Sequence, residues 1–205
     1  MNADARSAGR PPHTSRAAIR RIAEQLFDER GYRNVSLEAI AREVGIGRST
    51  LFSYFGSKRA ILEYDMEAAL RRLEQTLSHG EGPAMDVMVR AVADAARYGV
   101  VGHSTVVARW RIVESEPDLL AAEASLHKNM IDRLQRYAAA RAPASVDRDA
   151  LGMTAAALYG AANWSAHEWA RSENPTMPMD EYVLSRLTSV GAALRPMIGD
   201  ENDRA

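Results

Sequence analysis

The residues best suited to specific chemistry cluster in the run RSTLFSYFGSK, which begins at Arg48. The run offers a guanidinium at Arg48, an amine at Lys58 and several hydroxyl groups between them. Arginine donates to guanine acceptors, and hydroxyl groups serve either kind of base. If the run is helical, a rotation of about 100° per residue puts Ser49 and Ser53 opposite a buried Leu51. The pattern predicts a short helix that reads base edges in a major groove.

Phosphate groups need further donors, which lie on either side of these hydroxyl groups. Tyr54 and Lys58 can donate directly. Ser36 and Ser57 each precede a helical pattern, so they predict two helix N-termini whose free amides attract anions. Taken singly, an aromatic residue here favours helix packing and a lysine favours solvated surface. Their combination on one short segment favours a nucleic-acid interface.

Three helices must position these groups. The first is predicted to begin near Ser15, because apolar residues recur there at helical spacing, and to stop at Gly31. A second helix, over residues 37–44, is followed by the sequence GIG, which leaves room only for a tight turn before a third helix starts at Arg48. This order predicts a helix-turn-helix arrangement.

The rest of the chain is also helical in pattern, with no alternation of the strand type. The predicted fold class is therefore all-α, with about nine helices. A fourth helix, 58–77, connects the two domains, and five more are predicted near 84–98, 104–114, 117–141, 147–172 and 179–197. The domains are expected to be a flexible arm (1–14), a helix-turn-helix DNA-binding domain (15–60), a second helical domain (61–198) and a polar, frayed tail (199–205).

Charge separates the two halves of the chain. Residues 1–60 hold 11 Lys and Arg against 6 Asp and Glu, whereas residues 61–205 hold 15 against 21. The basic segment can neutralise several phosphates, and we expect the acidic remainder to face solvent or a partner subunit.

Composition excludes several classes of protein. Cysteine is absent, which rules out disulfide scaffolds, thiolate zinc sites and cysteine nucleophiles. No apolar run reaches the roughly 20 residues of a membrane span, and the N-terminus lacks the apolar stretch of a signal peptide. We therefore expect a soluble, cytoplasmic protein without a membrane partner.

An enzyme would have to use the five histidines or the scattered carboxylates. The pair His167-Glu168 and the combination of His103 with Arg109 form no recognised catalytic set. Metal-binding His-x-x-x-His spacing, Gly-rich phosphate loops and nucleophile elbows are absent. The sequence predicts no catalytic residue, no metal site and no cofactor. A helical protein-interaction module stays open as the alternative, although it would expose apolar anchors rather than hydroxyl groups on the third helix.

The segment from Ile19 to Leu62 resembles the DNA-binding domain of the tetracycline-repressor-like (TetR) family. The matching features are Ala23, Leu26 and Phe27 before Gly31-Tyr32, then Val35-Ser36-Leu37, Ile40-Ala41, Val44-Gly45-Ile46 and the run from Thr50 to Lys58. The resemblance implies that Arg48, Ser49 and Ser53 approach bases, while Phe55 lies in the core. The residues that it implies along the phosphates are Ser36, Thr50, Phe52, Tyr54 and Lys58.

The resemblance also implies that the second domain (61–198) is a regulatory domain and that it forms a homodimer through its last two helices. An apolar stripe on the last helix, and small residues on the helix before it, suit such a seam. The residues expected there are Leu151, Ala155, Val183, Leu187, Val190 and Leu194. A two-fold dimer would read a palindromic double-stranded operator with half-sites about 34–36 Å apart. The same stripes could instead face the protomer's own core.

Members of this family often hold a small-molecule effector in the second domain. The larger and polar side chains that could line such a pocket are Met88, Tyr98, His103, Arg109, Trp110, Met130, Trp164 and His167. Methionine and tryptophan at helical spacing are equally typical of a plain core. The stretch from Arg109 to Leu119 is similar to a subgroup associated with acyl-coenzyme-A-like ligands, whose phosphates could meet Arg109 or Arg111. An arginine at the pocket rim could pair with such an anionic group.

Together these features predict a dimeric transcriptional regulator. Its simplest action is steric repression, relieved when an apolar or amphipathic ligand binds the second domain and the fourth helix moves. Activation stays open, because the sequence does not reveal where the operator lies relative to a promoter.

Overall fold

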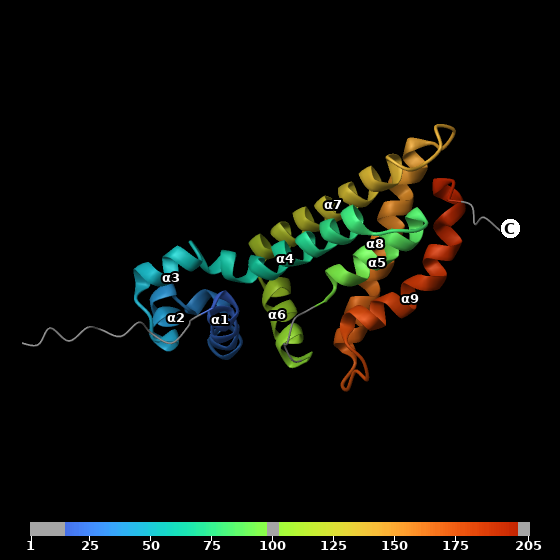
Figure 1. The fold of residues 1–205 in the computed structure, drawn as a ribbon. Helices are drawn as coiled ribbons and strands as arrows, with labels where there is room; N and C mark the ends of the chain where they lie inside the picture. The colour runs from blue at the N-terminus through green and yellow to red at the C-terminus, as the bar shows by residue number, and fades with distance from the viewer. Residues whose placement is uncertain (1–14, 98–102, 201–205) are drawn as a thin grey trace, which may run out of the picture. The chain divides into compact units, whose positions relative to one another are not determined.

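The computed structural model describes residues 15–97 and 103–200, and its regular elements are all helical (Figure 1). Within these ranges there is no strand, and no helix is long and apolar enough to span a membrane. The predicted all-α fold class is confirmed. The elements are α1 (Arg16–Arg30), η1 (Tyr32–Asn34), α2 (Leu37–Val44), α3 (Arg48–Tyr54), α4 (Lys58–His79), α5 (Ala84–Ala95), α6 (His103–Ser115), α7 (Pro117–Ala139), α8 (Arg148–Arg171), α9 (Met179–Leu194) and η2 (Arg195–Ile198), where η marks a 3-10 helix.

The chain divides into two compact units, and the division falls after Leu62. The first unit holds α1, η1, α2, α3 and the first turn of α4. Burying one large apolar side chain contributes about 1.5–3 kcal/mol, so a handful of them can hold a unit of this size together. The largest fully buried side chains of the first unit are Phe27, Ile19, Ile40, Leu51, Ile61 and Leu62.

The first two helices begin at serine caps, and α1 ends at a glycine, where the sequence predicted. The Ser15 hydroxyl accepts a hydrogen bond from the Ala18 amide at 3.1 Å, and the Ser36 hydroxyl accepts one from Ala39 at 3.1 Å. Gly31 ends α1 with a φ of 81°. The 3-10 turn η1 follows directly and was not predicted, because three residues are too few to show a periodicity.

The turn between α2 and α3 depends on Gly45. This residue has a φ of 77°, in the left-handed region that favours glycine. The Ile46 amide donates to the Ala41 carbonyl at 3.0 Å, which closes the end of α2. α3 then starts at Arg48, as predicted, and its direction is fixed by a turn of only three residues.

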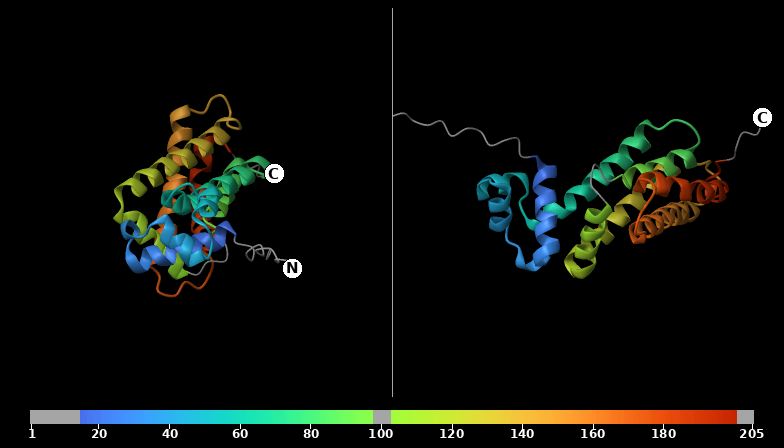
Figure 2. Two further views of the ribbon diagram at one scale, coloured as in Figure 1. Left: turned by 90° about the vertical axis from the view of Figure 1, so that its left-hand side faces the viewer. Right: turned by 90° about the horizontal axis from the view of Figure 1, so that it is seen from below.

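The second unit contains the rest of α4 and the helices α5 to α9. α8 packs against both α7 and α9, and α5 packs against α9 (Figure 2). The five predicted helices of this region are confirmed with ends that differ by up to three residues, since the helix predicted at 84–98 ends at Ala95. The largest fully buried side chains are Leu73, Met85, Met88, Leu134, Leu158 and Leu187.

α5 and α9 approach each other closely at Gly191. A Cβ atom built at this position would lie 2.7 Å from Val89 Cγ2 and 3.6 Å from Met85 Cγ. Real Cβ atoms do not come so near to a neighbouring carbon, so a larger residue would force the two helices apart. The glycine therefore sets the spacing between these helices.

The start of α5 is held by the far end of the chain. The N-cap residue, Pro83, makes no side-chain cap. Instead, the Asp200 carboxylate accepts a hydrogen bond from the Met85 amide at 2.8 Å, and Arg195 donates to the same carboxylate at 3.3 Å. The tail predicted from residue 199 thus begins with an anchored residue. The helix predicted over 179–197 changes to η2 at Arg195, because Pro196 has no amide hydrogen to continue it.

Candidate nucleic-acid interface and effector cavity

α3 presents one side to the core and the other to solvent. Leu51 is fully buried and Phe55 is 2% exposed. On the opposite side, Arg48, Ser49 and Ser53 are all exposed. The residues that the sequence predicted to read bases therefore share one accessible face of a short helix. That face combines a guanidinium with hydroxyl groups, which are the groups that can recognise base edges.

The other predicted residues of α3 lie beside this face. Thr50 and Phe52 are exposed, and Tyr54 is half-buried. Ser53 Oγ donates to the Thr50 carbonyl at 2.7 Å, so the Ser53 oxygen can still accept a hydrogen bond from a base amino group.

Glu38 is a residue of this surface that the sequence reasoning missed. Its Oε1 atom lies 2.8 Å from Arg48 Nε. A hydrogen bond from its own backbone amide lowers the pKa of Glu38, and the Ser36 hydroxyl and the nearby guanidinium lower it further. The carboxylate is therefore charged at neutral pH. The sequence did carry a signal for it, because an acidic residue in the first turn of α2 interacts favourably with the positive end of the helix dipole.

A surface hollow of about 570 Å³ brings two helix N-termini together. Ser36 caps α2, and the Ser57 hydroxyl accepts a hydrogen bond from the Ala60 amide at 3.0 Å at the start of α4. Both caps were predicted. The amides and basic side chains around such a hollow can bind phosphate oxygens. Its lining consists of residues 32–38, Arg48 and residues 56–59.

Lys58 has a structural partner in addition to its predicted place along the phosphates. Its Nζ donates to the Tyr32 carbonyl at 2.8 Å and lies 4.6 Å from the centre of the Tyr32 ring. An ammonium group has three donors, and a place along the phosphates stays a prediction for this residue. Lys58 thus joins η1 to the start of α4.

The second unit contains a cavity of about 100 Å³. Of the residues predicted to line a pocket, Arg109, Trp110 and Met130 do so. The other lining residues were not predicted, since they come from helix faces that meet only after folding. They are Asp65, Met66, Ala69, Val92, Ala95, Ala96, Glu123, Leu126, His127, Tyr159, Ala162, Asn163, Ala166 and Met179.

Four predicted pocket residues lie outside the cavity lining, and a fifth, Tyr98, lies outside the described residues. Met88 is fully buried in the core, and Trp164 is 65% exposed at the surface. His103 Nε2 lies 3.0 Å from the Ala170 carbonyl oxygen, so its ring serves helix packing. His167 is nearest, because its ring lies 4.3 Å from that of Trp110, which does line the cavity.

Charged groups in the cavity sit at different depths. Arg109 is 2% exposed, so it is buried and does not lie at a pocket rim. Glu123 and His127 are half-buried, one helical turn apart on α7. Burial lowers the pKa of His127, while the Glu123 carboxylate acts in the opposite sense and His167 adds a smaller lowering. The cavity can therefore offer a buried cation, carboxylates and aromatic walls to a ligand.

Comparison with known families matches residues 19–64 to the family described as bacterial regulatory proteins, tetR family. The match contains the whole of α2, the turn and α3, with their exposed arginine and hydroxyl groups. Residues 19–64 therefore form a TetR-family DNA-binding domain. This family comprises transcriptional regulators rather than enzymes, in agreement with the expectation of no catalytic activity.

Two transcriptional regulators are similar to this chain in sequence, over different lengths. The putative mycofactocin biosynthesis transcriptional regulator MftR of Mycobacterium tuberculosis is 27% identical over 201 residues, covering 89% of this chain and 97% of that protein. An HTH-type transcriptional regulator of Staphylococcus aureus is 41% identical over 56 residues, covering 27% of this chain and 30% of that protein. Among solved structures, SmeT of Stenotrophomonas maltophilia in complex with triclosan has a similar fold, with a TM-score of 0.61, 17% identity, and coverage of 87% of this chain and 90% of that one.

TetR-family regulators bind DNA as dimers, so the surfaces of α8 and α9 matter. Four residues expected in the dimer seam, Leu151, Ala155, Val183 and Leu187, lie in the protomer's own core instead, and they offer little surface to a partner. Val190 and Leu194 are half-buried. Periodicity identified the buried face of each helix, because apolar residues mark that face whatever covers it. The exposed large apolar residues on α8, α9 and η2 are Met153, Trp164, Leu184 and Met197.

Proposed function

We propose that this TetR-family regulator is a repressor that binds a palindromic operator as a dimer and leaves it when a small ligand binds. The observation that supports operator recognition is the division of α3 into a buried apolar side and an exposed side with a guanidinium and hydroxyl groups. A dimer bound over a promoter would obstruct the polymerase. Because its target is chromosomal DNA, the protein would act in the cytoplasm.

The exposed faces of α8 and α9 are the proposed dimer seam. Met153 and Trp164 are 58% and 65% exposed on α8, which is unusual for large apolar side chains on one helix. Gly160 lies between them and is exposed, and a Cβ built there would meet no atom within 4 Å. A small residue beside two large apolar ones lets a second helix approach closely. Association through this face would pair two α3 helices for the two half-sites.

The cavity is the proposed effector site. At about 100 Å³ it is smaller than the roughly 300–1,000 Å³ of pockets for drug-sized ligands, so it favours a small molecule. Buried Arg109 favours a polar or anionic group at the inner end, and Trp110 and Tyr159 favour an apolar body. SmeT with triclosan is a fold relative that holds a small molecule. We therefore infer a compact amphipathic effector.

An acyl-coenzyme-A-like effector is the larger alternative within the same proposal. A long acyl chain would require the cavity to expand, and the coenzyme phosphates would have to be met by exposed Arg111 rather than by buried Arg109. Acyl thioesters belong in the ligand screen for this reason. The alternative fails if they neither raise the melting temperature nor release DNA.

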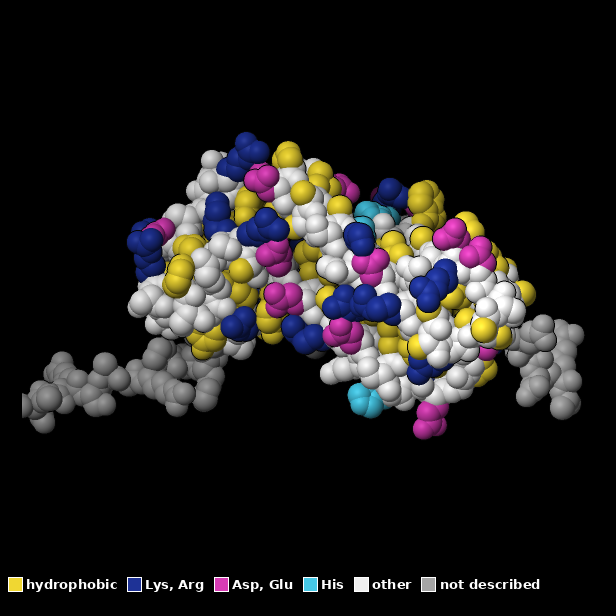
Figure 3. Space-filling model, turned by 90° about the horizontal axis from the view of Figure 1, so that it is seen from above, with side chains coloured by type: hydrophobic (Ala, Val, Ile, Leu, Met, Phe, Trp, Pro, Cys, Tyr) yellow, Lys and Arg dark blue, Asp and Glu magenta, His cyan; other side chains and the backbone are white. Residues whose placement is uncertain are grey.

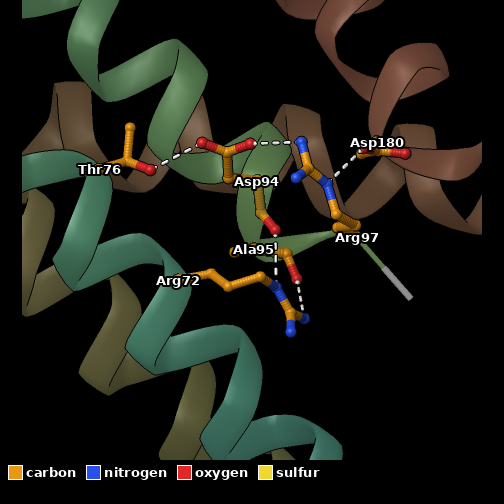
Figure 4. Close-up of polar contacts among 6 residues, drawn as sticks. All are labelled: Arg72, Thr76, Asp94, Ala95, Arg97 and Asp180. Atoms are coloured by element: carbon orange, nitrogen blue, oxygen red, sulfur yellow. Dashed lines mark hydrogen bonds and ion pairs between the residues drawn. The ribbon is translucent and has the colours of Figure 1, made fainter. Parts of the chain in front are cut away.

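Hydrogen bonds between α4 and α5 support a way for ligand binding in the cavity to affect the DNA-binding unit. Arg72 of α4 donates from Nε to the Asp94 carbonyl at 2.9 Å and from Nη2 to the Ala95 carbonyl at 3.2 Å (Figure 4). Ala95 also lines the cavity. Because α4 continues into the first unit, a ligand that shifts the end of α5 would act on α4. The ligand must bind the shifted state more tightly, since equal affinity would change nothing.

Selection of bound sequences from random duplex DNA tests the proposal directly. The purified protein should enrich a palindromic motif, and the winning complex should contain one or two dimers at physiological salt. Release of that duplex would then be screened against small carboxylates with apolar bodies and against acyl thioesters. If no sequence is enriched and binding disappears at modest salt, operator recognition is wrong.

A further inference from the structure

An acidic side chain stands within the surface that is expected to meet DNA. Glu38 lies in the first turn of α2, and its carboxylate contacts Arg48 at the start of α3, with an Oε1 to Nε distance of 2.8 Å. The two side chains are 46% and 73% exposed, so neither is hidden from a ligand. Figure 3 shows acidic side chains among Lys and Arg side chains on one face of the molecule. A carboxylate near phosphates repels them, so Glu38 should weaken binding to every duplex.

The geometry of the ion pair suggests what offsets this repulsion. A guanidinium has five N–H donors, of which Glu38 engages the one on Nε. The donors on the two Nη atoms can still form the bidentate contact with guanine O6 and N7. Arg48 is also the one charged residue in the sequence of α3. Its orientation therefore decides how this helix reads a base.

The carboxylate is itself held in place. Its own backbone amide and the Ser36 hydroxyl donate to it, which lowers the pKa of Glu38 and keeps the carboxylate charged at neutral pH. A flexible arginine that is 73% exposed would otherwise sample many rotamers, and binding would have to order it. An anchored carboxylate reduces that entropic cost for one orientation of the guanidinium.

We propose that Glu38 determines specificity by positioning Arg48 for a guanine in each half-site. The proposal rests on operator recognition by α3. At a site with the guanine, Arg48 contacts the base while Glu38 holds Nε. At a site without it, the base contact is lost but the repulsion between Glu38 and the phosphates remains, which widens the difference between correct and incorrect sequences.

The decisive variant is Glu38→Gln, which keeps the size of the side chain and removes its charge. Binding to an unrelated duplex should tighten about threefold, because one negative charge near the phosphates is gone. Discrimination at one base pair of the selected motif should fall about tenfold, since Arg48 is no longer held on its guanine. Dissociation constants for the best duplex, for duplexes with each base pair exchanged and for a random duplex measure both effects.

Two further variants separate the proposed role from a change of charge or fold. Glu43→Gln removes the same charge from an exposed position of α2 that lines a hollow with α1 residues, and it should leave discrimination intact. Arg48→Gln should lose discrimination at the same base pair as Glu38→Gln, and the double variant should lose no more than either single variant. Thermal melting of each variant checks that α2 is intact.

The outcomes distinguish this inference from operator recognition itself. If the wild-type protein enriches a motif and Glu38→Gln keeps full discrimination, Glu38 has no positioning role although DNA recognition stands. The same conclusion follows if Glu43→Gln loses as much discrimination as Glu38→Gln, or if Arg48→Gln affects discrimination at a different base pair. If the wild-type protein enriches no motif, operator recognition fails and the inference fails with it.

Discussion

Arg48 and Lys58 are both basic residues of the DNA-binding unit, yet the structure gives them different neighbours. Arg48 contacts a carboxylate on α2 and is largely exposed, whereas Lys58 is half-buried against Tyr32. We propose that the first contact positions a group that reads a base. The second holds η1 to the start of α4, beside the hollow that suits phosphates. At the scale of single residues, charge alone therefore does not define a role.

Replacement of Lys58 by alanine should weaken binding to all duplexes by a similar factor. One phosphate contact is lost, so the slope of the logarithm of affinity against that of salt concentration should fall by about one. Measurements over a range of salt concentrations, on the selected motif and on a random duplex, give this slope. Lys128→Ala is the matched control, because that exposed lysine pairs with Asp132 on α7 and should leave the slope unchanged. A change of base preference in Lys58→Ala would contradict the assignment.

The cavity residue His127 should make stability depend on pH. Burial lowers its pKa in the folded protein, so the unfolded chain takes up a proton first as the pH falls. The wild-type protein should therefore lose stability as the pH falls below about 6.5, the ordinary pKa of histidine. Urea unfolding at neutral and mildly acidic pH measures this loss, which should be smaller in His127→Gln. An equal loss in the variant would show that other groups cause it.

At the scale of elements, α4 connects the two units and also carries the contacts that fix α5. Arg72 caps the C-terminal carbonyls of α5, and Thr76 Oγ1 donates to Asp94 Oδ2 at 2.7 Å. Arg97 donates to the same Asp94 carboxylate. It also donates from Nε to Asp180 Oδ2, at the start of α9, at 2.9 Å (Figure 4). Three helices thus share one polar network beside the cavity.

The variant Arg72→Met should lower the free energy of unfolding by about 2 kcal/mol, because two backbone carbonyls lose a charged donor while the apolar stem stays. Its neighbour Arg71 is the control. Arg71 is exposed and pairs with Glu67 at 3.6 Å on the same helix, so Arg71→Met should change stability by less than about 0.5 kcal/mol. Urea unfolding measures both variants. Equal effects would mean that the network does not stabilise the second unit.

At the scale of the whole molecule, the proposed function depends on a second copy of the chain. One α3 helix has too few contacts for tight, specific binding, and two half-sites read by a dimer are the usual solution. The exposed face of α8 offers large apolar side chains on either side of Gly160. Exposure of such an apolar patch to water is unfavourable in a monomer, whereas a dimer interface would bury it.

The variant Gly160→Glu should separate the dimer without disturbing the protomer, since a side chain there enters open space. Across a two-fold axis it would place two like charges near each other. Sedimentation velocity should show a monomer at concentrations where the wild-type protein is a dimer, and operator affinity should fall by about tenfold or more. Ala124→Glu, on the exposed side of α7, should stay dimeric. A dimeric Gly160→Glu would place the seam elsewhere.

The sequence by itself determined the α-helices, the serine caps of the first unit and the exposed face of α3 that is proposed to read DNA. These follow from local rules: apolar spacing marks a buried face, a serine caps the amides that follow it, and a glycine such as Gly45 can adopt a positive φ. Resemblance to the TetR family rested on the same short segment, where spacing and structure are linked along the chain.

Only the tertiary structure decided which residues meet across helices. The cavity lining combines residues of α4 to α9, the Asp200 carboxylate caps α5, and Glu38 faces Arg48 across a turn. Periodicity could not assign Leu187 to the core or to a seam, nor place Arg109 deep in the protein, because one apolar stripe looks the same whatever packs on it. Those contacts depend on how the helices pack, which a pattern along one helix does not contain.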